Sequence, residues 1–379
     1  MTLVYVVAGE ASGDVLGARL ISAMRAQAGG LEVAGIGGAR MAEQGVASLF
    51  PMQELALMGL AEVLPNLLRL RRRLEQTESD IAARRPDIVV TIDSPGFTLR
   101  LLRRIAPLGL RRVHYVAPQV WAWRQERVKH FPGLWDRLLC LLPFEPDFFA
   151  PHGLNPVFVG HPVLESGADA GDAARFRTRF GLAESARPLI LMPGSRRTET
   201  ARLVPVFGET IQLLGPQFPD LVPVLAAAPA LAGELKAQAA TWPRPPLIVT
   251  NVAERYDAFA AADAALTKSG TSTLELALAG VPMAVTYRVN PISAMLARRL
   301  IKIPHVAMIN LLAGRELVPE LLQDACTPER LSAEIASLLG DPERAAAQRS
   351  GFSAALATLA IAGASSPSEA AAAAVLDLL

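Results

Sequence analysis

Several kinds of residue are scarce in this sequence, and each shortage excludes a class of site. The only cysteines are Cys140 and Cys326, which form no CxxC pair, so the cysteine content indicates a reduced, cytoplasmic setting. The five histidines show no HxH or HExxH spacing and no cluster with cysteine. No DxD pair of the kind that holds a divalent metal on a sugar diphosphate occurs either. We therefore expect no metal and no other cofactor.

The sequence also lacks an excess of charge of either sign and has no long apolar run. The formal net charge is +1, which argues against nucleic-acid binding, because such proteins normally carry a basic excess. No uncharged apolar run reaches the roughly 18 residues of a membrane-spanning helix. The first residues, TLVYVVAGE, predict a strand and lack the basic start of a signal peptide. What is present is a hydrophobic content of 51% over 379 residues, enough for two buried cores.

Short apolar runs alternate with helical patterns along the whole chain, which predicts βαβ units. The first half contains six such runs: 3–8, 32–36, 88–92, 112–116, 137–142 and 156–159. The second half contains five: 189–192, 222–226, 247–249, 264–267 and 283–286. Continuous Val/Ile/Leu runs are typical of parallel strands buried on both faces. We predict two Rossmann-like, doubly wound α/β domains, residues 1–166 and 167–344, with a tail over 345–379 that packs on the first domain or on a partner.

In doubly wound sheets, ligands bind beyond the carboxyl ends of the strands, so the loops after the predicted strands are the candidate site. The segment LTKSGTSTLELALAGVPMAV (266–285) ends a strand and opens a helix with four small residues: Ser269, Gly270, Thr271 and Ser272. Free N–H groups at such a helix start suit a diphosphate. Glu275 follows one turn later and is a candidate for a ribose diol. The alternative is an ordinary capped helix with an exposed glutamate.

The segment LMPGSRRTET (191–200) has the same form in the first loop of the second half. Gly194 and Ser195 make a turn after a strand, and Arg196 places a fixed positive charge at a helix start. A guanidinium there neutralises a pyrophosphate leaving group. The alternative is a pair of solvated arginines, Arg196 and Arg197.

Two loops of the first half carry carboxylates after predicted strands. In VAGEASGDVLGARL (7–20) these residues are Glu10, Ser12 and Asp14, of which Asp14 is equally suited to cap a helix. In VTIDSPGFTLRL (90–101), Asp93 stands at the end of a strand, where a carboxylate can act as a general base toward an acceptor hydroxyl. A capping or turn aspartate is the alternative there.

The segment HYVAPQVWAWRQERVKHF (114–131) concentrates aromatic and basic side chains, including Trp123 and Arg124. It is suited to bind a phosphate together with an apolar group. Core aromatics beside a solvated helix face are the alternative.

Taken together, these segments resemble the lipid A disaccharide synthase family of glycosyltransferases. The matching stretches run in order over most of residues 3–325 and include HYVAPQVWAWRQERVK, LLPFEPDFF, FVGHPVLE and NLLAGRELVPELLQ. The resemblance implies a GT-B architecture, two Rossmann-like domains facing each other across a cleft, without a metal. It implies UDP-2,3-diacylglucosamine as donor and 2,3-diacylglucosamine 1-phosphate (lipid X) as acceptor. It further implies a β(1→6)-linked disaccharide 1-phosphate with inverted anomeric configuration as the product.

The same resemblance assigns roles to individual residues. Asp93 looks like the base for the acceptor 6-hydroxyl, and Arg196 looks like a diphosphate contact. Glu10, Ser12 and Asp14 look like the acceptor side, where we also expect Trp123 and Arg124. Ser269–Ser272, Glu275 and Asn310 look like donor-nucleotide contacts. Two other functions stay open: a related GT-B transferase acting on a lipid-linked peptidoglycan precursor, and a noncatalytic sugar-nucleotide or lipid-binding protein. A homodimer is a further possible assembly.

One stretch, LPNLLRLRRRL (64–74), is both apolar and basic. On a helical wheel the leucines gather on one side, with a main helix that we expect to start at Pro65. The residues concerned are Leu64, Leu67, Leu68 and Leu70, with Arg69, Arg72 and Arg73. Because both implied substrates carry acyl chains, we expect this helix to bring the protein to an anionic membrane surface, on the inner face of the cytoplasmic membrane. An amphipathic helix packed on its own sheet is the alternative.

Overall fold

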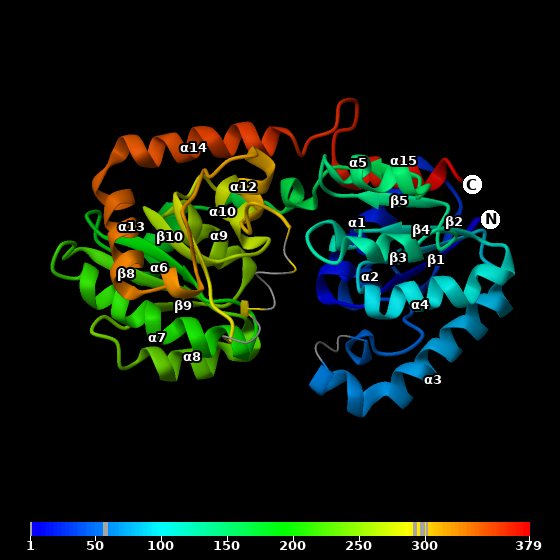
Figure 1. Cartoon of the computed structure of the whole chain (residues 1–379), viewed down its shortest axis with the longest axis horizontal. Helices are drawn as coiled ribbons and strands as arrows, with labels where there is room; N and C mark the ends of the chain where they lie inside the picture. Colours follow the sequence, from blue (N-terminus) through cyan, green and yellow to red (C-terminus); the bar gives the residue numbers. More distant parts are fainter. Residues whose placement is uncertain (1, 56–59, 291–293, 296–299, 301) are drawn as a thin grey trace. The chain divides into compact units, whose positions relative to one another are not determined.

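The computed structural model describes residues 2–55, 60–290, 294–295, 300 and 302–379; for residues 60–65 it describes the backbone alone. The chain divides into two compact units, Met1–Pro162 with Leu359–Leu379, and Val163–Thr358. Each unit contains a six-stranded parallel sheet covered by helices (Figure 1). The predicted fold class, two doubly wound α/β domains, is confirmed.

The first unit has the strand order β2-β1-β3-β4-β5-β6. The strands are β1 (Thr2–Ala8), β2 (Leu31–Ile36), β3 (Ile88–Ile92), β4 (Arg111–Tyr115), β5 (Arg137–Cys140) and β6 (Pro156–Phe158). The α-helices in its first part are α1 (Ala11–Gln27), α2 (Ala39–Glu43), α3 (Leu60–Arg84), α4 (Pro95–Ile105) and α5 (Glu145–Phe149). The strand order reverses between β1 and β3, and such a switch point opens a crevice at the carboxyl ends of the two strands.

The second unit has the order β12-β11-β10-β7-β8-β9. Its strands are β7 (Arg187–Met192), β8 (Leu221–Ala226), β9 (Leu247–Val249), β10 (Ala264–Lys268), β11 (Met283–Tyr287) and β12 (Glu320–Leu322). The helices are α6 (Ala173–Phe180), α7 (Arg197–Leu214), α8 (Ala232–Ala239), α9 (Val252–Ala260), α10 (Ser272–Leu278), α12 (Met308–Ala313), α13 (Pro328–Gly340) and α14 (Pro342–Ala357). Here the order reverses between β7 and β10. Strand β12 was not predicted, because its sequence, Glu-Leu-Leu, has only two apolar residues in succession.

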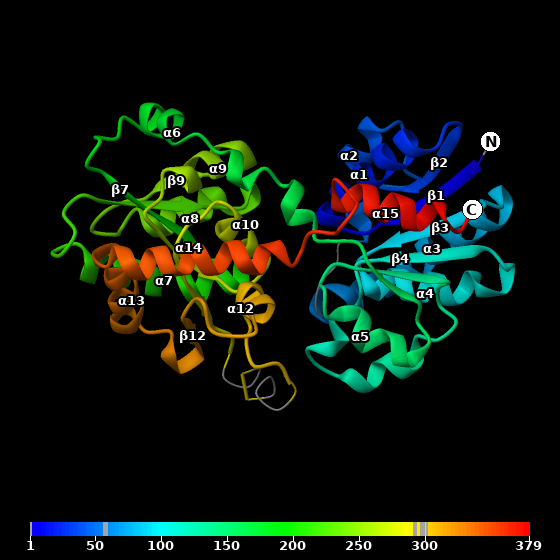
Figure 2. The same ribbon diagram turned by 90° about the horizontal axis from the view of Figure 1, so that it is seen from above.

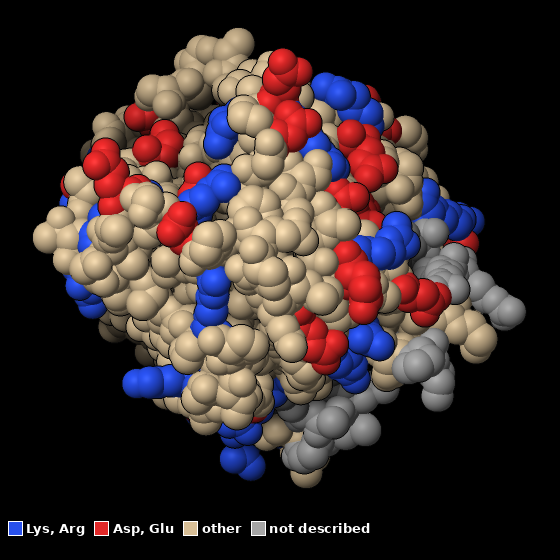
Figure 3. All heavy atoms as spheres, turned by 90° about the vertical axis from the view of Figure 1, so that its left-hand side faces the viewer, with Lys and Arg blue, Asp and Glu red and all other residues tan. Residues whose placement is uncertain are grey.

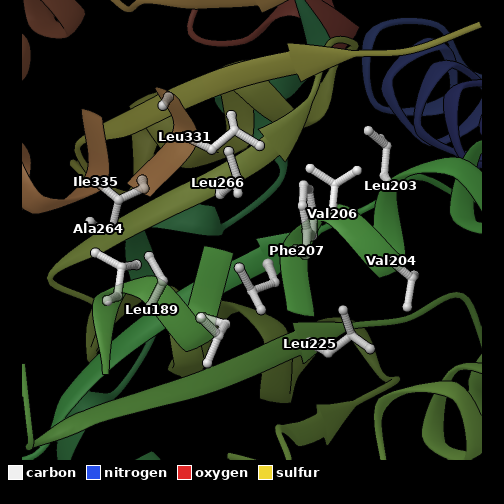
Figure 4. Packing of buried hydrophobic residues seen from close by; sticks show 14 of the residues in the cluster. Leu189, Leu203, Val204, Val206, Phe207, Leu225, Ala264, Leu266, Leu331 and Ile335 are labelled. Carbon is white, nitrogen blue, oxygen red and sulfur yellow. The ribbon is translucent and has the colours of Figure 1, made fainter. Parts of the chain in front are cut away.

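The core of the second unit explains the apolar runs of its strands. Leu189 on β7 and Leu266 on β10 are completely buried, as are Phe207 on α7 and Ile335 on α13 (Figure 4). Burying a side chain of this size stabilises the fold by about 1.5–3 kcal/mol. The packed sheet is thus a rigid base from which the loops at the carboxyl ends of β7 and β10 project. On the face drawn in Figure 3, acidic and basic side chains are interspersed.

The C-terminal tail is divided between the two units. Helix α14 belongs to the second unit, whereas α15 (Pro367–Leu376) lies against α1 of the first (Figure 2). Arg137 fixes α15 by donating a hydrogen bond to the Ala374 carbonyl at 2.6 Å and by pairing with Asp377 at 2.9 Å. The chain therefore returns to its own first unit, and packing of the tail on a partner stays a prediction.

Candidate functional site

Asp93 lies at the switch point of the first unit, directly after β3. Asp93 and Ser94 both have left-handed backbones, with φ of 50° and 45°. The Asp93 N–H donates to the Tyr115 carbonyl at 2.9 Å, and the Thr98 hydroxyl donates to the Asp93 carbonyl at 2.7 Å. A non-glycine residue in this backbone region persists only where its surroundings hold it there, and such residues cluster at functional sites. The backbone of Asp93 is therefore fixed on both sides.

Two further observations concern the surroundings of this carboxylate. Burial raises the pKa of Asp93, partly offset by a backbone hydrogen bond at Ser94. The loop after β1 touches the loop after β3, because a Cβ atom on Gly9 would lie only 2.7 Å from the Ser94 Cβ. Glycine at position 9 thus permits the close approach of the two loops. A shielded carboxylate with a raised pKa is better matched to proton abstraction near neutral pH than an ordinary aspartate.

Of the five residues predicted for the acceptor side, the three that follow β1 differ in their placement. Glu10 precedes α1 and is half-buried, and Ser12 is exposed on the first turn of that helix. Asp14 is 5% exposed, and its carboxylate accepts hydrogen bonds from the N–H groups of three residues at 2.7–3.0 Å: Gly38, Arg40 and Met41. Asp14 therefore caps α2, and its role on the acceptor side stays a prediction.

The aromatic segment after β4 is held by a glutamate that the sequence analysis missed. Glu145 is buried, accepts a hydrogen bond from the Trp121 indole at 3.0 Å, and caps the N–H groups of Leu141 and Leu142. Burial raises the pKa of Glu145 to about 7. Two residues beyond Trp121, the exposed Trp123 ring stacks under the Arg124 guanidinium at 4.7 Å. The buried tryptophan is core, whereas the Trp123–Arg124 pair is available at the surface.

At the switch point of the second unit, the two predicted phosphate loops are joined by Glu199. Its carboxylate accepts the Ser195 N–H at 3.2 Å and pairs with Arg196 at 3.4 Å and with Lys268 at 3.2 Å. Ser195 and Arg196 follow β7, whereas Lys268 ends β10. The loops that were predicted separately therefore lie together. Neither Glu199 nor Lys268 was singled out; the available signal was an acidic residue in the first turn of α7.

Two residues further along the chain, Glu275 and Asn310, were predicted to contact the nucleotide, and their surroundings differ. Glu275 is partly exposed; its Oε1 accepts hydrogen bonds from Arg255 at 3.1 Å and from Tyr256 at 3.0 Å. Among the described residues, Glu275 Oε2 has no partner and can accept a ligand hydroxyl. Asn310 is fully buried, and its side-chain amide forms hydrogen bonds with Leu317, Val318 and Glu320 at 2.8–3.0 Å. The side-chain amide of Asn310 therefore supports the loop before β12, and its contact with the nucleotide stays a prediction.

Two of the small residues after β10 already use their hydroxyl groups in hydrogen bonds within the protein. The Ser269 hydroxyl donates to the Val306 carbonyl at 2.7 Å, and the Ser272 hydroxyl lies 3.2 Å from that of Thr267. Thr271 is exposed, and Gly270 lies beside the Lys268 ammonium. Within the described part of the chain, no three His, Cys, Asp or Glu side chains are arranged to hold a metal ion.

Comparison with known proteins assigns the family. Residues 4–375 match the model of the lipid-A-disaccharide synthetase family. The chain belongs to this family. It is 63% identical over 339 residues to the lipid-A-disaccharide synthase of Granulibacter bethesdensis, covering 89% of this chain and 86% of that protein. It is 58% identical over 377 residues to that of Gluconobacter oxydans, covering 100% and 91%. The resemblance stated from the sequence is confirmed, and it supports an enzyme of this family over the two alternative functions.

Solved structures at low identity show the fold. One is the UDP-GlcNAc 2-epimerase from Neisseria meningitidis bound to UDP-GlcNAc, with a TM-score of 0.65 at 11% identity, covering 100% of this chain and 99% of that one. Another is the glycotransferase of kitacinnamycin, with a TM-score of 0.62 at 19% identity and the same coverage. The agreement over the whole chain supports the GT-B fold.

Proposed function

We propose that this enzyme transfers a 2,3-diacylglucosaminyl group from UDP to the 6-hydroxyl of lipid X, which gives the β(1→6) disaccharide 1-phosphate and UDP. The observation that carries the proposal is the family relationship over residues 4–375. The geometry supports it, because each doubly wound unit places the expected chemistry at its own switch point. The first unit has Asp93 after β3, and the second has Arg196 and Lys268 after β7 and at the end of β10.

In this mechanism Asp93 is the general base. Its carboxylate accepts the proton of the acceptor hydroxyl while the oxygen attacks the anomeric carbon of the donor. The bond from that carbon to the UDP oxygen breaks, and its electron pair leaves with UDP. A single displacement of this kind inverts the anomeric configuration. Trp123 and Arg124, which form an exposed apolar and cationic pair, suit the acyl and phosphate groups of lipid X.

The donor nucleotide is assigned to the second unit. Arg196 balances the charge that develops on the diphosphate as UDP leaves. The N–H groups that begin α10, from Gly270 to Ser272, are suited to phosphate oxygens, and Glu275 Oε2 to the ribose diol. A structural neighbour described as bound to UDP-GlcNAc supports a UDP-sugar as the donor class.

The reaction can be tested directly. The purified enzyme, incubated with UDP-2,3-diacylglucosamine and lipid X, should yield the disaccharide 1-phosphate and UDP by mass spectrometry. A parallel incubation with UDP-GlcNAc separates the diacylated donor from a simple amino-sugar donor. Turnover of UDP-GlcNAc without turnover of the diacylated donor would overturn the proposed substrate.

The pH dependence should report the state of Asp93. The base must be ionised, so kcat should be full above the pKa of Asp93 and should fall as the pH drops through it. Because burial raises this pKa, the acid limb should lie above the ordinary aspartate range. A kcat profile at saturating substrates checks this. The residual activity of Asp93→Asn should lack the limb, and a limb that persists there would assign the titration to another group.

Helix α3 is the proposed contact with the membrane. Among the described residues, no helix combines the length and apolarity needed to span a bilayer. Leu67 and Leu68 on α3 are 43% and 82% exposed, and Arg69 and Arg72 are exposed beside them. A leucine pair flanked by arginines suits an anionic lipid surface, where each basic residue contributes about 1 kcal/mol.

The structure also limits the predicted surface. Arg73 pairs with Glu54 at 2.7 Å and lies over the Phe50 ring, so it joins α3 to the preceding loop instead of facing lipid. Leu70 is half-buried, and the side chain of Leu64 lies outside the described residues. The helix begins at Leu60, five residues before the expected start at Pro65, so that expectation was wrong. The early position of Pro65 costs one backbone hydrogen bond near the helix start.

Replacing Leu67 and Leu68 together with serine should weaken binding to vesicles that contain phosphatidylglycerol by about tenfold or more, since each buried leucine contributes about 1.5–3 kcal/mol. Co-sedimentation measures the binding, and added salt should release the wild-type protein. Leu213→Ser is the matched control, because Leu213 on α7 is 41% exposed. Unchanged vesicle binding, or a lowered melting temperature, would indicate that these two leucines serve packing.

A further inference from the structure

Glu199 is the most enclosed charged group at the switch point of the second unit. Its side chain is 7% exposed, whereas those of its cationic partners, Lys268 and Arg196, are 21% and 52% exposed. A buried carboxylate is costly unless it is paired and hydrogen-bonded. Glu199 is paired twice and also accepts a backbone N–H, so the cost of burying its carboxylate is offset by these contacts.

The backbone around Glu199 is shaped to admit it. Gly194 has a φ of 110°, and a Cβ atom there would lie 2.9 Å from the Glu199 Cβ. The glycine therefore lets the turn after β7 close over the carboxylate. From this position Glu199 reaches back to the Ser195 N–H and across to Lys268, whose ammonium also lies 5.6 Å from the Tyr287 ring centroid. One side chain thus fixes elements from both sides of the switch point.

This cluster contains two cations, Arg196 and Lys268, that both pair with the single carboxylate of Glu199. Its cations are more exposed than its carboxylate and lie where a doubly wound sheet binds ligands. Oxygens of a diphosphate match this arrangement of two cations and a turn.

We propose that Glu199 is a positioning residue for the diphosphate of the donor, and that Lys268 is a second cation of that site beside Arg196. The proposal rests on the proposed function, because it takes the UDP-sugar as donor. Glu199 holds Lys268 and the Ser195–Arg196 turn in the arrangement that receives the diphosphate. The charge on the ligand is met by the two cations, and Glu199 acts through them.

The direction in which one substitution changes the UDP affinity separates a positioning role of Glu199 from a simple effect of its charge. Glu199→Ala removes a negative charge beside an anionic ligand, so charge alone predicts tighter binding of UDP. If Glu199 positions the cations, the same change should weaken UDP binding by about ten- to a hundredfold, because charge-assisted contacts are lost. Calorimetry with UDP measures the change. Glu209→Ala, an exposed glutamate on the same helix, is the matched control and should leave the UDP affinity unchanged.

Binding of uridine, which lacks both phosphates, distinguishes a loss of diphosphate contacts from a general structural defect of the site. Glu199→Ala should bind uridine as the wild type does, measured by ligand-observed NMR, whereas a collapsed site would lose uridine and UDP together. Equal losses of both ligands, or unchanged or tighter UDP binding, would overturn the proposal.

A double-mutant cycle tests the connection to Lys268 even if the alanine variant does not fold. Lys268→Met should weaken UDP binding about tenfold or more. Glu199→Gln keeps an oxygen for the Ser195 N–H but no charge for the ammonium, and it should add little once Lys268 is gone. Additive losses would show that Glu199 does not act through Lys268. Failure of the wild-type enzyme to bind UDP would instead count against the proposed donor.

Discussion

Replacing Asp93 with asparagine should lower kcat by about 10²–10⁴-fold, the range expected for loss of a general base. Asparagine has nearly the same shape, so the left-handed turn after β3 and its backbone bonds to Tyr115 and Thr98 should persist. Affinity for UDP should be unchanged, because the residues proposed to bind the donor belong to the second unit. Turnover is measured by release of UDP at saturating donor and lipid X.

Asp87→Asn is the matched control for this experiment. Asp87 is exposed just before the other end of β3, where its carboxylate accepts the Leu3 N–H at 2.8 Å, and an asparagine oxygen can replace it. This variant should keep wild-type kcat. Near-normal turnover of Asp93→Asn would remove Asp93 from the mechanism, and loss of UDP binding in that variant would show a wider structural change.

Arg196→Ala and Glu275→Ala should each weaken UDP binding by about 1.5–3 kcal/mol, the contribution of a hydrogen bond to a charged group. Arg196 is half exposed at the start of α7, so its removal leaves no cavity. Glu275 also holds Arg255 and Tyr256, so its melting temperature should be measured beside its affinity. Calorimetry gives the free energy of UDP binding for each variant.

Arg197→Ala controls for the loss of an arginine at this helix start. Arg197 follows Arg196 directly, is 77% exposed, and pairs with Glu234 at 3.3 Å, so its loss should leave UDP affinity unchanged. Equal losses in Arg196→Ala and Arg197→Ala would indicate a general effect of charge. Unchanged UDP affinity in both Arg196→Ala and Glu275→Ala would place the nucleotide elsewhere.

The sequence located the loops that follow the strands, but it did not show which hydrogen bonds each side chain in them makes. Asp93 and Arg196 were predicted from their places after apolar runs, and both lie at switch points. Asp14 and Asn310 were predicted as ligand contacts, yet both are buried with their hydrogen bonds taken by the protein. A capping carboxylate and a binding carboxylate have the same local sequence pattern. Only the position of the neighbouring backbone separates them.

The amphipathic stretch shows the same limit. Helical periodicity grouped leucines on one side of α3, but it gave no means of telling exposed Leu68 from buried Leu74. It also counted Arg73 with the basic face, although Glu54, from a turn outside the helix, pairs with it. Periodicity reports which residues share a face, whereas exposure depends on what that face packs against.

By itself, the sequence determined eleven of the twelve described strands, the doubly wound class and the family, because apolar runs and motifs are local properties of the chain. Only the tertiary structure decided the strand orders, and with them the β1/β3 and β7/β10 switch points. It alone brought Glu199 to Lys268 and returned α15 to α1. These contacts join residues far apart in sequence. Which residues meet in these contacts depends on how the whole sheet packs, and a local sequence pattern contains no information on that packing.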